Sequence, residues 1–274
     1  MSPLYFVRLP LSIPALGRWA ADRNLGWSVR RGAKGQERDA GLDEGRALHH
    51  LLTETFGQRV LHPFRLFVAP QAKQGHVYAY SRAGHAALLE VAQACAMPEA
   101  QTVFDLQGLA AKTMPDNWRV GRRMGFEVRV RPVSRLLKPL PNSGGAFAKG
   151  AELDVFLIEA LRRFPSGSAS DSEPQDTKQD TMLKAGRTRE AVYTDWLAQK
   201  LADSATLVPG VRLTRFERDR AARTGSSIEG PSAILQGDLM IDQPENFPRL
   251  LAGGIGRHKA YGYGMMLLRP PRSH

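Results

Sequence analysis

Patterns typical of strands and helices alternate along this 274-residue chain in one order, and that order occurs twice. In the first half, short alternating runs predict strands and longer periodic runs predict helices. These segments are a strand at 4–9, a helix at 42–57, strands at 59–70 and 76–82, a helix at 84–96 and a strand at 102–107. The first half therefore has the order β-α-β-β-α-β.

The second half repeats this order with additional helix. Its predicted segments are a strand at 126–137, helices at 151–164 and 190–205, strands at 210–219 and 232–242, a short helix at 244–253 and a strand at 261–270. Two such units predict an α+β fold of tandem ferredoxin-like (RRM-like) domains with helical insertions.

We expect the domains to span 1–115 and 116–274. The first contains an arginine-rich insertion at about 10–41. The second contains a polar segment at about 165–189, expected to be a flexible loop, and a glycine-rich loop at 253–264.

The charge balance favours a polyanionic partner. Lysine and arginine number 38 against 27 acidic residues, which gives a formal net charge of +11. Each phosphate that such side chains neutralise releases condensed counterions. Arginine dominates three clusters, at 18–38, 119–138 and 212–223, and its planar guanidinium suits phosphate recognition. The alternative is a soluble basic protein without such a partner.

Membrane and secreted classes are not indicated. No run of 18 apolar residues is present, so we expect neither a membrane span nor a membrane partner. The N-terminal stretch is interrupted by Arg8, Pro10 and Pro14 and does not resemble a secretion signal. Cys95 is the only cysteine, which suits a reducing cytoplasm. We therefore expect a cytoplasmic protein.

The stretch LLAGGIGRHKAYGYGMMLLRP, at 250–270, combines glycines with basic residues. It is not a P-loop or a dinucleotide fingerprint, because it lies between a helix and a following strand and Lys259 is not followed by serine or threonine. The glycines are Gly254, Gly256, Gly262 and Gly264, and the basic residues between them are Arg257, His258 and Lys259. Such a loop can present amides and cations to phosphates. The alternative is a helix cap followed by a tight turn. We favour RNA contact.

The C-terminal third resembles the CRISPR precursor-RNA processing endonucleases of the RAMP superfamily, in their CasE-like branch and the related type IV processing nucleases. The similarity is carried by the GIG…K…G.G loop before a terminal apolar strand and, more weakly, by MGFEVRVRPV and ALHHLLTETFG; it covers about half of the chain. The resemblance implies two ferredoxin-like domains, metal-independent cleavage of a CRISPR repeat hairpin and retention of the product RNA.

Such cleavage uses the RNA's own 2′-hydroxyl as the nucleophile, leaving a 2′,3′-cyclic phosphate and a 5′-hydroxyl. The protein has to align the reacting atoms, move a proton and stabilise charge on the phosphorane. The single cysteine and the scattered histidines show no metal-ligand spacing. We therefore expect no metal and no cofactor.

His49 is the first catalytic candidate. At 100° per residue it lies at the edge of the apolar stripe that begins at Leu48, while His50 faces solvent. It also matches the position of the family's histidine. The insertion before this helix is longer and richer in arginine than the resemblance predicts, so Arg23 and Arg38 are competing candidates. A protonated arginine can stabilise the phosphorane but is no ordinary base. The alternatives are a surface histidine and a solvated loop.

The remaining basic residues are expected to follow RNA phosphates and 2′-hydroxyls, because the deep groove of A-form RNA excludes side chains. The predicted RNA-binding residues are Arg30, Arg31, Lys34, Arg119, Arg122, Arg123, Arg129, Arg131, Arg215, Arg218, Arg257, His258 and Lys259. Of these, Arg129 and Arg131 alternate with apolar residues and are expected on a basic outer face of their strand.

The expected partners are CRISPR repeat RNA, the mature crRNA and other Cas subunits of an effector complex. Two other interpretations stay open. One is a non-catalytic RNA-binding RAMP subunit of an effector complex, and the other is a housekeeping RNA-binding protein of the same architecture. Cleavage of a repeat transcript in EDTA would distinguish the processing endonuclease from both of these alternatives.

Overall fold

The computed structural model describes residues 2–25, 43–140, 147–163, 182, 185–223 and 226–271. Its first sheet has the order β2-β3-β1-β4, with all neighbouring strands antiparallel. The strands and helices of this half are β1 (Tyr5–Ser12), α1 (Ile13–Asp22), α2 (Glu44–Phe56), β2 (Phe64–Val68), β3 (Gln74–Ser81), α3 (His85–Cys95), α4 (Pro98–Val103) and β4 (Ala110–Thr113). This strand order is the ferredoxin-like order.

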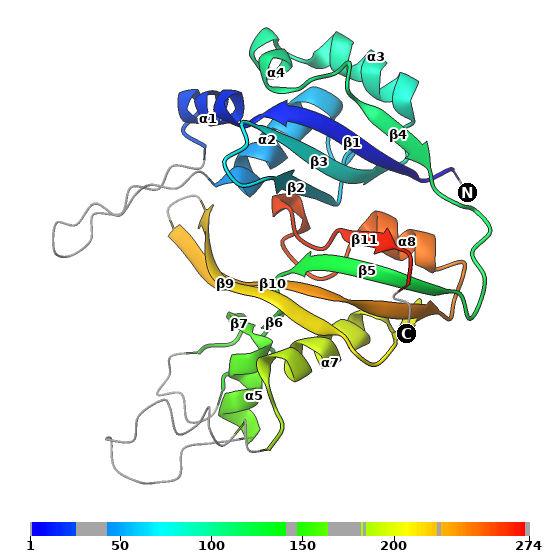
Figure 1. The fold of residues 1–274 in the computed structure, drawn as a ribbon. Coiled ribbons are helices and arrows are strands. Elements are labelled where there is room, and N and C mark those ends of the chain that lie inside the picture. Colours follow the sequence, from blue (N-terminus) through cyan, green and yellow to red (C-terminus); the bar gives the residue numbers. More distant parts are fainter. Residues whose placement is uncertain are drawn as a thin grey trace, which may run out of the picture.

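The second sheet has the order β11-β5-β10-β8, and β9 also pairs with β10 (Figure 1). Its half of the chain contains β5 (Arg123–Val130), β6 (Val133–Arg135), β7 (Glu152–Asp154), α5 (Val155–Arg163), α7 (Arg189–Leu201), β8 (Ala205–Leu207), β9 (Arg212–Arg223), β10 (Ser226–Ile241), α8 (Phe247–Gly253), a 3-10 turn η1 (Lys259–Tyr261) and β11 (Met266–Arg269). The predicted tandem ferredoxin-like fold is confirmed, with β6 and β7 forming a small separate hairpin.

Alternation along β1 divides the first sheet between two cores. Val7 and Leu9 are fully buried against the helices that cover one face. Phe6 on the other face packs against a second cluster, which contains Tyr80 of β3 and Phe126 of β5. Because successive side chains of a strand point to opposite faces, one sheet contributes to both cores. The two sheets are thereby packed together.

Two polar contacts also join the sheets. Arg65 of β2 forms an ion pair of 2.6 Å with Glu127 of β5. The Tyr80 hydroxyl donates a hydrogen bond of 2.8 Å to the backbone carbonyl of Met266. Burial raises the pKa of Tyr80 far above its usual value, so this hydroxyl keeps its proton. The contacts fix β11, and the loop before it, relative to the first sheet.

The strand predicted at 102–107 is wrong. Residues Pro98–Val103 form α4, and β4 lies further on, at Ala110–Thr113. Proline is favoured in the first turn of a helix, and Ala100 and Val103, three residues apart, are both buried. Phe104 makes only an isolated bridge with Leu11.

The first part of the predicted arginine-rich insertion is regular structure rather than a plain connection. Ser12 caps α1 by accepting a hydrogen bond from the backbone of Ala15, and Leu16 and Trp19 are buried against the first sheet. Residues 26–42 and most of the predicted flexible loop at 165–189 lie outside the described residues.

The predicted outer face of β5 is wrong in one respect. Arg131 directly follows the strand and is only 1% exposed, and its guanidinium donates a hydrogen bond of 2.8 Å to the backbone carbonyl of Asp219. The alternation of apolar and polar residues is real, but the polar face of β5 is only partly exposed, because Glu127 pairs with Arg65 of the first sheet and Arg129 pairs with Asp219 of β9.

Candidate active site

Helix α2 positions His49. The Asp43 carboxylate caps the helix by accepting a hydrogen bond of 3.0 Å from the backbone of Arg46, and the buried stripe that includes Leu48 and Leu51 fixes its rotation. His49 is half-buried at the edge of that stripe and His50 is exposed. The helix and the placement of both histidines agree with the prediction; the catalytic role of His49 remains a prediction.

The glycine-rich loop is closed on itself and attached to β5. The Ile255 amide donates a hydrogen bond of 2.8 Å to the Gly264 carbonyl. The Gly264 amide donates one of 2.7 Å to the backbone carbonyl of Arg129. Gly264 has a φ of 80°, and a Cβ there would collide with the Ile255 carbonyl. Gly254 also has a positive φ and ends α8. Glycine is therefore required at both positions by the positive φ, and at Gly264 also by the close approach of the Ile255 backbone.

The loop lies directly against α2. A Cβ on Gly45 would lie 2.5 Å from the carbonyl oxygen of Tyr261, which is closer than real Cβ atoms approach. One turn further along, the His49 ring meets the Tyr261 ring edge-on, with centroids 5.8 Å apart. The close packing at Gly45 therefore sets the distance between His49 and the loop.

A cavity of about 710 Å³ opens between α2, the segment before β2 and the glycine-rich loop. Its basic and imidazole side chains are His49, Arg59, His62, His258 and Lys259. The volume lies in the range of small-molecule sites, and five groups that are cationic or can become so make it suitable for an anion such as a phosphodiester.

Burial and nearby basic side chains lower the pKa values of the ionisable groups in the cavity. Burial lowers the pKa of His62 to about 4, with further lowering by Lys259, Arg59 and His49. Burial, and then His50, lowers the pKa of His49. Burial followed by Arg59 lowers that of Lys259, whose ammonium donates a hydrogen bond of 2.7 Å to the Gly253 carbonyl. Both histidines are therefore predominantly neutral near pH 7.

The other two basic residues of the loop bind a carboxylate. Arg257 forms an ion pair of 2.5 Å with Glu152 of β7, and the His258 ring bonds to the other oxygen of Glu152. His258 has a positive φ of 58°. The predicted phosphate contacts of Arg257 and His258 would therefore compete with Glu152, whereas Lys259 already faces the cavity.

Replacing Glu152 with glutamine is expected to lower the free energy of unfolding at pH 7 by about 1 to 3 kcal/mol, the range for charged hydrogen bonds. The His258 hydrogen bond, followed by Arg257, lowers the pKa of Glu152 below its ordinary value of 4.5. Its contribution is therefore complete above pH 4.5 and is lost as the pH falls through the lowered pKa. Urea unfolding of both proteins at several pH values should show the difference shrinking below pH 4.5; a constant difference would contradict it.

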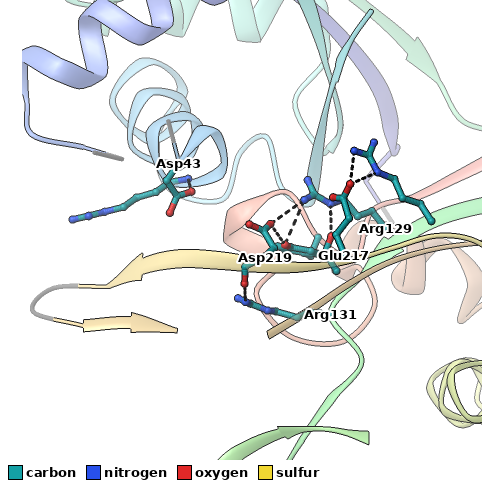
Figure 2. Close-up of polar contacts among 9 residues, drawn as sticks. Asp43, Arg129, Arg131, Glu217 and Asp219 are labelled. Carbon is teal, nitrogen blue, oxygen red and sulfur yellow. Dashed lines mark hydrogen bonds and ion pairs between the residues drawn. The ribbon is translucent and has the colours of Figure 1, made fainter. Parts of the chain in front are cut away.

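The predicted arginines of the second half occupy different environments. Arg129 pairs with the Asp219 carboxylate at 3.1 Å and Arg131 reaches the backbone of the same residue, close to the start of α2, where Asp43 lies (Figure 2). Arg123 pairs with Asp238 at 2.7 Å. Besides Arg257, the exposed members of the set are Arg119, Arg122, Arg215 and Arg218, of which Arg215 pairs with Glu217.

Asp219 also connects the β9 strand to the glycine-rich loop. The Tyr263 hydroxyl donates a hydrogen bond of 2.6 Å to the Asp219 carboxylate. Mainly because of burial, the pKa of Tyr263 rises to about 12, so it stays a donor. The Arg129 guanidinium lies 4.6 Å from the centre of the Tyr263 ring. Arg129 therefore supports the glycine-rich loop.

Arg23 does not line the cavity. It follows α1, its guanidinium lies 4.5 Å from the centre of the Trp19 ring, and it pairs with Glu54 of α2 at 3.6 Å. Its side chain is 31% exposed. Through these contacts Arg23 joins α1 to α2. The other predicted residues of the insertion, Arg30, Arg31, Lys34 and Arg38, lie outside the described residues.

Three residues of this region were not singled out from the sequence: Arg59, His62 and Glu152. His62 comes directly before Pro63 at the beginning of a strand, a position where a polar side chain can project from a sheet edge. That signal is weak in the sequence alone. Only the packing of the glycine-rich loop against α2 brings His62 into one cavity with His49.

Among the helices of the described residues, none is both long and apolar enough to cross a membrane. Within the same ranges, no group of three or more histidine, cysteine or acidic side chains is arranged to hold a metal ion.

The fold and the cavity define a class: a protein of two ferredoxin-like units with a basic, histidine-containing cavity between its first long helix and a glycine-rich loop. Residues 5–270 match the family model described as CRISPR associated protein. The chain belongs to this family.

Solved structures of other proteins have the same fold. Cse3 of Thermus thermophilus, bound to an RNA representing a pre-cleavage complex, is 14% identical with a TM-score of 0.57; the match covers 98% of this chain and 100% of that one. The CRISPR-associated protein Cas6e of Escherichia coli K-12 is 17% identical with a TM-score of 0.56, over 97% and 99% of the two chains. No curated protein matches the sequence.

Proposed function

We propose that this protein is a metal-independent endoribonuclease that cleaves CRISPR repeat RNA at the base of its stem-loop. The observation that carries the proposal is the cavity that places His49 beside Lys259 and Arg59 in a member of the CRISPR associated family. A CRISPR endoribonuclease of the same fold is described as bound to 19 nt RNA, which supports RNA as the substrate here.

In the proposed reaction the 2′-hydroxyl attacks the adjacent phosphorus, and the products carry a 2′,3′-cyclic phosphate and a 5′-hydroxyl. The half-buried ring of His49, held by α2 and Tyr261, is placed to transfer a proton. Lys259 and Arg59 are placed to stabilise negative charge on the phosphorane. These roles need no group other than side chains of this chain.

The exposed arginines give the RNA stem its binding surface in this proposal. Arg119 and Arg122 precede β5 and Arg215 and Arg218 lie on β9, all exposed. We further propose that the protein retains the mature crRNA and assembles with other Cas subunits. Breaking the Arg215 pair with Glu217 costs little, because exposed ion pairs contribute about 0 to 1 kcal/mol.

Purified protein is expected to cut its cognate repeat transcript at one position in EDTA, with a 2′,3′-cyclic phosphate on the upstream product. Denaturing gels and mass spectrometry of the fragments measure this. A transcript with 2′-deoxyribose at the cleavage position is the matched control and should stay intact. Binding without a cut would favour the non-catalytic RAMP subunit, and a cut only with added magnesium would contradict the mechanism.

Substituting alanine for Arg23 is expected to have a small effect on the cleavage rate, below about tenfold, because its guanidinium contacts Trp19 and Glu54 rather than the cavity. The expected loss of stability is also small, about 0 to 1 kcal/mol, because the pair with Glu54 is long, at 3.6 Å, and both side chains are partly exposed. Single-turnover rates measure the first and urea unfolding the second. A hundredfold slower rate with unchanged stability would instead support the catalytic role predicted for Arg23.

A further inference from the structure

The cavity contains a second histidine. His62 lies in the segment between α2 and β2, is half-buried, and lines the same cavity as His49. The groups that act on it come from each element around it: Arg59 from its own segment, His49 from α2 and Lys259 from the glycine-rich loop. The two imidazoles therefore share one basic cavity.

Both rings are available to a substrate. His258 also lines the cavity, but it is bonded to Glu152. Among the described residues, the rings of His49 and His62 have no hydrogen-bond partner; the Thr53 hydroxyl bonds to the backbone carbonyl of His49 and leaves its ring free. The structure thus presents two half-buried imidazoles with free nitrogen atoms beside a lysine.

The proposed reaction requires two proton transfers. The 2′-hydroxyl loses a proton as its oxygen attacks phosphorus, and the departing 5′-oxygen gains one. One imidazole cannot be the empty acceptor and the protonated donor at the same moment, so two groups poised together lower the barrier more than one.

We propose that His62 is a catalytic residue, the general base that accepts the 2′-hydroxyl proton while His49 is the general acid. This inference rests on the proposed cleavage function. The 2′-oxygen to phosphorus bond forms and the phosphorus to 5′-oxygen bond breaks. The proton of the 2′-hydroxyl goes to His62, a proton from the His49 imidazolium goes to the 5′-oxygen, and exchange with water restores both rings.

The electrostatic setting supports this division of roles. Lys259 and Arg59 act on His62, whose pKa falls to about 4, so it enters the reaction as a neutral acceptor. Burial and then His50 lower the pKa of His49, and neither Lys259 nor Arg59 contributes to that lowering. A bound phosphodiester offsets the charge of Lys259 and Arg59, which raises the pKa of His62 and makes it a stronger base.

A substrate with sulfur in place of the bridging 5′-oxygen tests the roles separately, because a thiolate leaves without being protonated. On ordinary repeat RNA in EDTA, we expect His62→Ala and His49→Ala each to slow single-turnover cleavage by about 10² to 10⁴-fold. On the sulfur substrate His49→Ala should recover to within about tenfold of wild type, and His62→Ala should stay slow. Recovery of His62→Ala, or an unchanged rate on ordinary RNA, overturns the inference.

Controls keep the outcomes distinct. His85, exposed at the start of α3 and outside the cavity, supplies the control variant His85→Asn, which should cleave at the wild-type rate. His62→Asn is the second variant should His62→Ala fold poorly, and circular dichroism checks both. If wild type does not cut the repeat, the proposed function fails and the inference with it. If wild type cuts and the His62 variants cut equally well, only the inference fails.

Titration by NMR gives a readout independent of cleavage. In the free protein the ring of His62 should titrate near pH 4, and 2′-deoxy repeat RNA, which binds but is not cut, should raise that pKa. The assignment comes from the signal lost in His62→Asn. An unchanged pKa with saturating RNA would show that the phosphodiester does not reach His62 and would overturn the inference.

Discussion

Alanine in place of His49 is expected to slow single-turnover cleavage of the repeat RNA by about 10² to 10⁴-fold, the usual contribution of a proton-transferring side chain. The affinity for RNA should change little, because the exposed arginines that contact the stem in our proposal lie elsewhere. The ring is at the edge of the buried stripe of α2 and against Tyr261. Its loss therefore removes the proton-transferring group while the apolar stripe that packs the helix remains. Rapid-quench kinetics and a filter-binding titration measure the two quantities.

His50→Asn is the matched control for this experiment. His50 is on the same helix, one residue further, and is exposed; its replacement should alter the rate by less than about threefold, an effect through its small influence on the pKa of His49. A rate within tenfold of wild type for His49→Ala, together with a loss of a hundredfold or more for Arg38→Ala, would transfer the main catalytic role to the arginine-rich insertion.

Placing alanine at Gly264 is expected to destabilise the protein by about 2 to 5 kcal/mol, since it combines a strained backbone with overpacking. The residue has a φ of 80°, and the new Cβ would meet the carbonyl of Ile255, in the segment that pairs with Gly264. Displacement of the loop would also move Lys259 out of the cavity and Tyr261 away from the His49 ring, so RNA cleavage should fall together with stability. Thermal unfolding should show a melting temperature lower by roughly 5 to 15 °C.

Gly253→Ala is the control for the stability measurement. Gly253 lies eleven residues earlier, at the end of α8, with open space where a Cβ would go and no positive φ. Its melting temperature should stay within about 2 °C of wild type. If the melting temperature changed equally little in both variants, the positive φ and close packing at Gly264 would not be what requires glycine there.

The sequence was informative where local chemistry decides the structure. The apolar spacing in α2 predicted both the helix and the edge position of His49, and the glycines at 254 and 264 predicted backbone that other residues adopt poorly. It misled where local patterns are ambiguous. The segment 102–107 has a β-like composition, yet its beginning belongs to a helix and its end to an irregular connection, because burial of Ala100 and Val103 against the first sheet outweighs propensity.

The arginine clusters show a second limit of prediction from the sequence. Arginine clustering favoured a polyanionic partner, but a sequence does not show which guanidinium is already paired. Arg131 proved buried, Arg129 bound to Asp219, and Arg257 bound to Glu152. Each partner lies at least 88 residues away along the chain. Such pairs cannot be read from spacing, because they depend on the register between strands.

The sequence by itself determined the order of elements, the tandem fold, the basic character and the edge position of His49, since these depend on periodicity, composition and backbone preference within a few residues. Only the tertiary structure decided which groups meet His49. His62 and Lys259 are separated by nearly two hundred residues, and they enter one cavity because Gly45 allows α2 to pack closely against the loop at Tyr261.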